Sequence, residues 1–129
     1  MSSPSRLERC VPTLRVRDAS AACRYFCEQL GFTKDWEHRF EPGLPLFVSV
    51  SRDGVAIHLS EHAGDGPLEV RVYVYVHDPQ ALFDELDARG ARIVAGPERQ
   101  SYGTLEFIVE DLDGNRLRFG KAVGSSKAR

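Results

Sequence analysis

The sequence has no long apolar run, little cysteine and no strong excess of charge of one sign. None of its apolar stretches approaches the roughly 20 residues that cross a bilayer. Met1 to Arg9 also lacks the apolar centre of a secretory signal, so we expect a cytoplasmic protein that does not bind membranes. The net charge is −2, and the basic residues are scattered among acids, which argues against nucleic acid as a partner.

The three cysteines form no recognisable metal or redox motif. Cys10, Cys23 and Cys27 are odd in number and lack the paired spacing of zinc and dithiol sites. Cys23 and Cys27 lie four residues apart on a predicted helix and therefore share one of its faces. We expect buried free thiols, with redox or metal chemistry at Cys23 and Cys27 as the weaker alternative.

Several catalytic motifs are also absent. The sequence has no nucleophile-turn serine, no phosphate-binding glycine loop and no dinucleotide fingerprint. What remains is ordinary globular composition, with 129 residues, 42% hydrophobic and 28% charged. We therefore expect one soluble domain over residues 1–129 with a sizeable core.

The first half, about residues 9–62, reads as a strand, a helix and three strands. Asp18 is placed to cap the helix and Gly31 to end it, and Asp53-Gly54 suits a tight hairpin turn. The predicted strands are Val11–Val16, Thr33–Arg39, Leu46–Ser51 and Val55–Glu61, and the predicted helix is Ala19–Leu30.

The second half, about residues 68–122, repeats this order after a linker at Glu61–Pro67. Pro79 suits the first turn of a helix that runs to about Arg89. The predicted strands are Val70–Val76, Arg92–Ala95, Leu105–Val109 and Arg116–Phe119. Three landmarks recur in order at offsets of 59 or 60 residues: Asp18 and Asp78, Gly31 and Gly90, and Asp53-Gly54 and Asp113-Gly114. The predicted fold is α+β, with two βαβββ modules forming a curved mixed sheet around a pocket.

Four segments carry a family resemblance that covers nearly the whole chain. The segments are Val11–Asp18, Leu30–Phe32, Tyr102–Phe107 and Asp111–Leu117. On these segments the chain resembles the vicinal-oxygen-chelate superfamily of glyoxalases, bleomycin resistance proteins and dioxygenases, and is most similar to its metal-free, bleomycin-resistance-type members.

Metal-dependent members of this superfamily hold a divalent ion with ligands at four inward-facing positions, and the resemblance implies which residues occupy these positions in this chain. Here these are Val11, His58, Arg71 and Arg118, and the internal offset of 60 pairs the first with the third and the second with the fourth. Only His58 can bind a metal, whereas guanidinium groups repel one. We therefore expect no metal and no cofactor.

The two arginines have a positive implication. If alternation points both Arg71 and Arg118 inward, their charges favour an anionic or hydrogen-accepting ligand. The alternative is that one or both pair with internal acids such as Glu69 or Glu106. His58 likewise has the alternative of a hydrogen-bonded core or pocket residue rather than a catalyst.

Aromatic residues supply the other candidates. The stretch Gly31–Phe40 is similar to the second strand of bleomycin-binding proteins, which places Asp35, Trp36 and Phe40 at or near acid and aromatic binding positions. Flat rings suit stacking on planar heterocycles, although Trp36 or Phe40 in the core is the alternative. Tyr102, followed by Gly103, stands where those proteins often carry a Trp-Gly pair. Tyr73 is an aromatic residue within the predicted strand Val70–Val76. The histidine-rich run His58–Asp65 is interpreted as pocket rim only.

These observations favour a metal-free small-molecule binding protein of the antibiotic-resistance type. It would sequester a planar or charged ligand in a groove shared across a homodimer and carry no catalytic residue. The alternative is a glyoxalase-like lyase or isomerase with His58 as base and Arg71 or Arg118 as oxyanion stabilisers. The predicted ligand-binding residues are Asp35, Trp36, Phe40, His58, Arg71, Tyr73, Tyr102 and Arg118.

Overall fold

A computed structural model describes residues 4–39 and 41–124, so the predicted ligand-binding residue Phe40 lies outside the described residues. Eight strands, two α-helices and one 3-10 helix follow one another in the described chain. They are β1 (Thr13–Arg15), α1 (Ala19–Gln29), β2 (Thr33–His38), β3 (Phe47–Arg52), β4 (Val55–Ser60), a 3-10 helix η1 (Ala63–Asp65), β5 (Arg71–Tyr75), α2 (Pro79–Ala88), β6 (Arg92–Arg99), β7 (Thr104–Glu110) and β8 (Arg116–Ala122).

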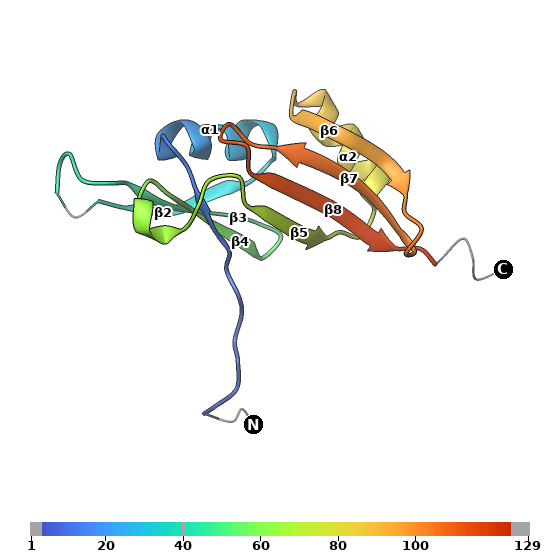
Figure 1. Ribbon diagram of the computed structural model, residues 1–129, viewed down its shortest axis with the longest axis horizontal. Helices are drawn as coiled ribbons and strands as arrows, with labels where there is room; N and C mark the ends of the chain where they lie inside the picture. Colours follow the sequence, from blue (N-terminus) through green and yellow to red (C-terminus); the bar gives the residue numbers. More distant parts are fainter. Residues whose placement is uncertain (1–3, 40, 125–129) are drawn as a thin grey trace.

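The strands form two mixed sheets with the same internal order. Module one has the order β1-β4-β3-β2 and module two the order β5-β8-β7-β6. In each sheet the first strand runs parallel to the last strand of its module, and the other neighbours are antiparallel. Neither sheet closes, and both helices lie on the same side of the molecule (Figure 1). The α+β class and the two βαβββ modules are thus confirmed.

The internal repeat is visible in atomic detail. Asp18 and Asp78 cap their helices with almost the same backbone angles, and each accepts a hydrogen bond from the amide three residues later. The parallel pairs also match at an offset of 60 residues, because Thr13 lies opposite His58 and Tyr73 lies opposite Arg118. The β3–β4 turn has positive φ at both Asp53 and Gly54, as a tight two-residue hairpin requires.

Strand alternation gives each sheet one buried and one uncovered surface. The buried face packs beneath the helices and carries the apolar core residues. We call the opposite surface, turned away from the helices, the open face of each module. The fully buried side chains of the two sheets are Leu14, Val16, Val48, Val50, Ile57 and Leu59 in and next to module one's strands, and Phe107, Val109 and Leu117 in module two's.

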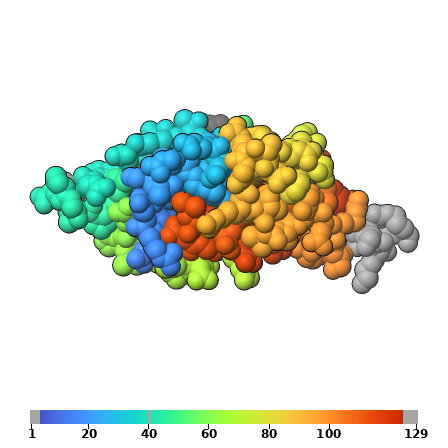
Figure 2. All heavy atoms as spheres, turned by 90° about the horizontal axis from the view of Figure 1, so that it is seen from above, coloured from blue at the N-terminus to red at the C-terminus, as the bar shows by residue number. Residues whose placement is uncertain are grey.

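The two modules lie side by side along the long axis and are tied by hydrogen bonds. Figure 2 shows the first half of the chain, in blue and cyan, next to the gold and orange strands and helix of the second. The Tyr25 hydroxyl donates to the Glu110 carbonyl at 2.8 Å and accepts from the Arg92 amide at 3.0 Å. Asn115 donates to the Arg15 carbonyl at 3.0 Å. These contacts join α1 and β1 of module one to module two.

The cysteine prediction is only partly confirmed. Cys23 and Cys27 are half-buried against the core, and burial together with the neighbouring Cys27 raises the pKa of Cys23 to about 11. Cys10 is exposed, because it precedes β1 and no element covers it. Neither described α-helix has the length and apolarity to cross a membrane.

Candidate functional site

The open face of module one carries an acid and an aromatic side by side. Consecutive strand residues normally point to opposite faces of a sheet. A β-bulge between Lys34 and Trp36 shifts the register of β2, so the side chains of both Asp35 and Trp36 lie on this face. Ser49 and Ser51 on β3 donate to the Asp35 carboxylate at 3.1 and 2.7 Å. The bulge therefore brings two of the predicted ligand-binding residues to one surface.

Three rings from three strands form an aromatic cluster on this face. Trp36 stacks on Phe47 with ring centroids 5.7 Å apart and an angle of 10° between planes. His58 meets both rings edge-on, at 5.3 Å from Trp36 and 5.0 Å from Phe47. Trp36 is 45% exposed, so the alternative of a core position is wrong for it. Its exposed surface is available for stacking on a planar molecule.

A pocket of about 540 Å³ adjoins the cluster. Trp36, Phe47 and Leu44 line it, and His62 and Asp65 from the segment after β4 also border it. Ser60 donates to the Asp65 carboxylate at 2.6 Å, because η1 turns the chain back toward the strand end. Part of the run interpreted as pocket rim thus borders a cavity.

His58 is electrostatically disfavoured as a cation. Its partial burial and the positive charge of Arg9 both lower its pKa, with Asp35 opposing them. The imidazole is therefore neutral near neutral pH. In that state it packs as an aromatic ring and has one nitrogen able to accept a proton.

The open face of module two carries the predicted arginines and tyrosines. Arg71, Tyr73, Tyr102 and Arg118 all line one pocket of about 470 Å³, together with Arg116. The alternation of β5 and β8 places Arg71, Tyr73 and Arg118 opposite the apolar side chains that pack under α2. The predicted convergence of Arg71 and Arg118 on one cavity is therefore a feature of the structure.

Glu106 organises this second pocket. Its carboxylate is only 2% exposed and accepts hydrogen bonds from four side chains: Tyr73 (2.8 Å), Tyr102 (2.9 Å), Thr104 (2.7 Å) and Arg118 (3.0 Å). Burial raises the pKa of Glu106, but these hydrogen bonds outweigh it and leave the pKa below its usual value. Burial and the adjacent Glu106 raise the pKa of Tyr73 to about 12, so its hydroxyl keeps its proton. Arg118 therefore forms an ion pair with the internal acid Glu106, as one of the two alternatives for the arginines predicted.

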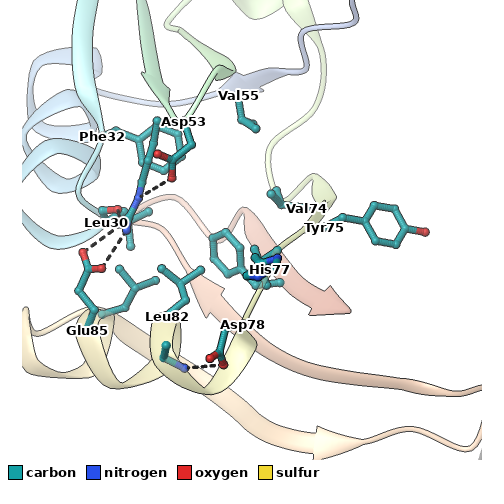
Figure 3. Close-up of a pocket in the computed structure, with 15 residues that line it drawn as sticks. Leu30, Phe32, Asp53, Val55, Val74, Tyr75, His77, Asp78, Leu82 and Glu85 are labelled. Atoms are coloured by element: carbon teal, nitrogen blue, oxygen red, sulfur yellow. Dashed lines mark hydrogen bonds and ion pairs between the residues drawn. The ribbon is translucent and has the colours of Figure 1, made fainter. Parts of the chain in front are cut away.

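A third pocket, of about 460 Å³, lies where the modules meet (Figure 3). Phe32 and Asp53 border it from module one, and Leu82 and Glu85 from α2. Arg52 crosses the junction and donates to both Glu85 oxygens, at 3.0 and 2.8 Å, and to the Leu30 carbonyl at 2.9 Å. Among the described residues, no predicted ligand-binding residue lines this pocket, and the Arg52–Glu85 ion pair forms part of its polar lining.

The structure sorts the predicted residues into two sets. One contains Asp35, Trp36 and His58 on module one, and the other contains Arg71, Tyr73, Tyr102 and Arg118 on module two. Phe47 and Arg116 were missed. The alternation of strand side chains could have identified both residues, because residues two apart on a strand lie on the same face. Phe47 thus shares a face with Ser49, and Arg116 shares one with Arg118.

The residues present do not fit the divalent metal of the metal-dependent relatives. Of the four positions that the resemblance implies, Val11 is apolar and Arg71 and Arg118 are cations, which leaves His58 alone. Within residues 4–39 and 41–124, no group of three or more histidine, cysteine, aspartate or glutamate side chains could hold a metal ion. We therefore derive no chemical step through a metal.

Comparisons with known proteins agree with this geometry. A family model described as "Glyoxalase superfamily protein" matches residues 3–126, whereas no curated protein matches the chain. Several solved structures share the fold, including the following three. A glyoxalase/bleomycin resistance protein/dioxygenase superfamily member from Sphaerobacter thermophilus is 20% identical, with a TM-score of 0.71 over 89% of this chain and 98% of that one.

The other two structures are TnmS3 and TioX. TnmS3, an antibiotic binding protein from Streptomyces sp. CB03234, is 18% identical, with a TM-score of 0.74 over 93% of this chain and 99% of its own. TioX from Micromonospora sp. ML1 is 19% identical, with a TM-score of 0.70 over 92% of this chain and 98% of its own. At these identities the likeness is one of fold.

Proposed function

Because this chain belongs to the glyoxalase superfamily, we propose that it is a metal-free small-molecule binding protein of the bleomycin-resistance type. The observation that carries the proposal is the exposed cluster of Trp36, Phe47 and His58 beside a cavity. A flat heterocycle that stacks on Trp36 buries apolar surface on both partners. Asp35, held by two serine hydroxyls, adds a fixed negative charge at the edge of that surface.

The fold neighbour TnmS3 supports the choice of binding over catalysis. That protein is described as an antibiotic binding protein, and its structure aligns with almost the whole of this chain. Antibiotics with planar ring systems match the shape and chemistry of the aromatic cluster. The ligand class of this chain is therefore proposed to be a planar antibiotic, sequestered without chemical change.

The groove is proposed to be completed by a second copy of the chain. In one chain the aromatic and arginine-rich pockets lie on the open faces of different sheets, and neither face is covered by a helix. A homodimer that places module one of one copy opposite module two of the other would enclose a ligand between them. Such an arrangement has the closed two-fold symmetry of most homodimers.

The test is a calorimetric titration with metal-free bleomycin in the presence of EDTA. We expect saturable binding by the unaltered protein and a loss of about tenfold or more in affinity for Trp36→Ala. Leu112→Ala is the matched control, because Leu112 is an exposed apolar residue that lines none of the three pockets described. No saturable heat, or equal affinity in all three proteins, would refute the proposal for this ligand class.

A second candidate is a lyase or isomerase with His58 as general base. The observation in its favour is the lowered pKa of His58, which keeps the imidazole in its basic form near neutral pH. His58→Ala separates the two functions. An enzyme would lose turnover by orders of magnitude, whereas a binding protein would lose only part of its affinity for the ligand.

A further inference from the structure

We propose that the pocket on the open face of module two is an oxyanion subsite, which binds a carboxylate or phosphate group of the ligand through Arg71 and Arg118. Glu106 acts as the positioning residue of this subsite. The inference rests on the proposed binding function and adds the chemical class of the group that module two recognises.

Counting hydrogen-bond donors leads to this conclusion. Each tyrosine hydroxyl has one proton, and both Tyr73 and Tyr102 give theirs to the Glu106 carboxylate. Thr104 does the same. The hydroxyl groups around the pocket can therefore only accept hydrogen bonds from a ligand, and the donors that remain are guanidinium N–H groups.

These guanidinium groups have unused capacity. Arg118 donates to Glu106 and Tyr102 through one nitrogen, Nη1, and its side chain is 39% exposed. The Arg71 side chain makes no hydrogen bond or ion pair with any described residue. Arg116 is held by Glu110 at 3.3 Å. The pocket is lined by three arginines. Glu110 and Glu106 form ion pairs with two of them, Arg116 and Arg118, which leaves Arg71 as a cation without an ion pair among the described residues.

A glycine makes the arrangement possible. Gly120 lies beside Arg118 on β8, and a Cβ atom there would overlap the Tyr73 hydroxyl and come within 2.9 Å of the Glu106 Cγ. The absence of a side chain lets Tyr73 reach across β8 to Glu106. Burying a carboxylate costs desolvation energy, which the four hydrogen bonds to Glu106 offset, so the network holds the Tyr73, Tyr102 and Arg118 side chains in fixed positions beside the cavity.

Module one has no equivalent of this network. Phe47 on β3 pairs with Ser60 on β4, just as Glu106 on β7 pairs with Gly120 on β8. Phe47 is therefore the module-one equivalent of Glu106, and Ser60 that of Gly120. The same fold position is therefore aromatic in one module and anionic in the other. The open face of module one is suited to stacking on a planar ring, and that of module two to binding a negatively charged group. The inferred ligand therefore combines a planar ring system with an oxyanion.

The experiment is an NMR titration of the full chain with three probes: benzoate, inorganic phosphate and the neutral isostere benzamide. We expect saturable shifts at module-two residues with benzoate or phosphate, and binding of benzamide weaker by about tenfold. Arg71→Gln should lose about tenfold in anion affinity without disturbing the Glu106 network. Arg24→Gln, an exposed residue of α1 that loses the same charge, is the matched control.

Glu106→Gln tests the positioning role. The glutamine amide donates to one tyrosine oxygen, so that tyrosine turns its proton toward the pocket. Benzamide binding should then strengthen by about threefold or more, whereas a purely structural role would weaken it or leave it unchanged. Unchanged benzamide affinity in a folded variant contradicts this role.

The outcomes separate this inference from the proposed function. Equal binding of benzoate and benzamide, no binding of either anion, or equal anion affinity in Arg71→Gln and Arg24→Gln overturns the oxyanion subsite. Phosphate has no ring that could stack on Trp36, so Trp36→Ala should leave phosphate affinity unchanged. Preference between benzoate and phosphate identifies whether the group is a carboxylate or a phosphate.

Discussion

Glu106 illustrates how one buried charge shapes the surface above it. Its carboxylate is satisfied entirely by neighbouring side chains, and three of these are hydroxyls whose protons are thereby withdrawn from the pocket. At the equivalent place in module one, Phe47 stacks on Trp36 instead. Differences at this position and at the facing position, Ser60 in module one and Gly120 in module two, therefore give the two open faces different chemistry.

The lowered pKa of Glu106 predicts a pH-dependent stability. A depressed folded-state pKa adds stability above the unfolded value of 4.5, and this stability is lost as the pH falls through the folded pKa. At about pH 6, Glu106→Gln should unfold with a free energy lower by about 2 kcal/mol. The difference should become smaller as the pH falls below 4.5 and through the folded-state pKa. Denaturant unfolding over a series of pH values from about 6 downward checks this, and a pH-independent difference would contradict it.

The cysteines differ in exposure, so their reactivity should differ as well. Cys10 is exposed, whereas burial and its neighbour Cys27 raise the pKa of Cys23 to about 11. Near pH 8, a thiol-reactive dye should modify one cysteine rapidly and the other two slowly. Cys10→Ser should remove the fast phase. A fast phase that persists in this variant would show that Cys23 or Cys27 is accessible.

At the scale of the elements, the matched helix caps provide a test of the repeat. Asp18 and Asp78 hold equivalent N-cap positions with the same hydrogen-bond pattern. Replacing either with alanine should lower the free energy of unfolding by about 1 kcal/mol, and by similar amounts in the two modules. Thermal unfolding measures this, with Ser20→Ala on the exposed surface of α1 as control. A cap effect in only one module would contradict their structural equivalence.

Local signals were sufficient to predict the elements but not the bulges. Caps, glycine stops and Asp-Gly turns act within a few residues, so both helices and most strands were predicted close to their observed bounds. The predictions for β6 and β8 were too short, because β6 continues past Ala95 to Arg99 and β8 past Phe119 to Ala122. The β2 bulge at Asp35 and its counterpart in β6, between Ile93 and Ala95, depend on the register of pairing with the next strand, β3 or β7. Without the bulge, Asp35 and Trp36 would have been expected on opposite faces.

At the scale of the whole molecule, the contacts between modules depend on side chains far apart in the sequence. Arg52 in the β3–β4 hairpin binds Glu85 on α2, and nothing local to either residue predicts the pair. The same holds for Tyr25 with Glu110 and Arg92. The convergence of Arg71 and Arg118 was expected from the family resemblance, the internal offset of 60 and the alternation of strand side chains, and both residues line one pocket. The sequence did not predict that the aromatic and cationic sets would lie on separate sheets.

The Arg52–Glu85 pair should couple the stability of the modules. Both side chains are partly exposed, so solvent screens the pair, and we expect Arg52→Ala to cost about 1–2 kcal/mol. A double-mutant cycle with Glu85→Ala should give a coupling energy of about 1 kcal/mol. Additive effects of the two substitutions would indicate that the pair contributes nothing beyond its separate side chains.

The central claim is that a planar ligand stacks on module one without a metal. Trp36 is the only tryptophan in the chain, so its fluorescence reports this surface directly. Titration with metal-free bleomycin in EDTA should quench that fluorescence saturably, and His58→Ala should shift the titration to higher ligand concentration. An emission that does not change up to ligand saturation in a parallel calorimetric titration would place the ligand elsewhere and contradict the claim.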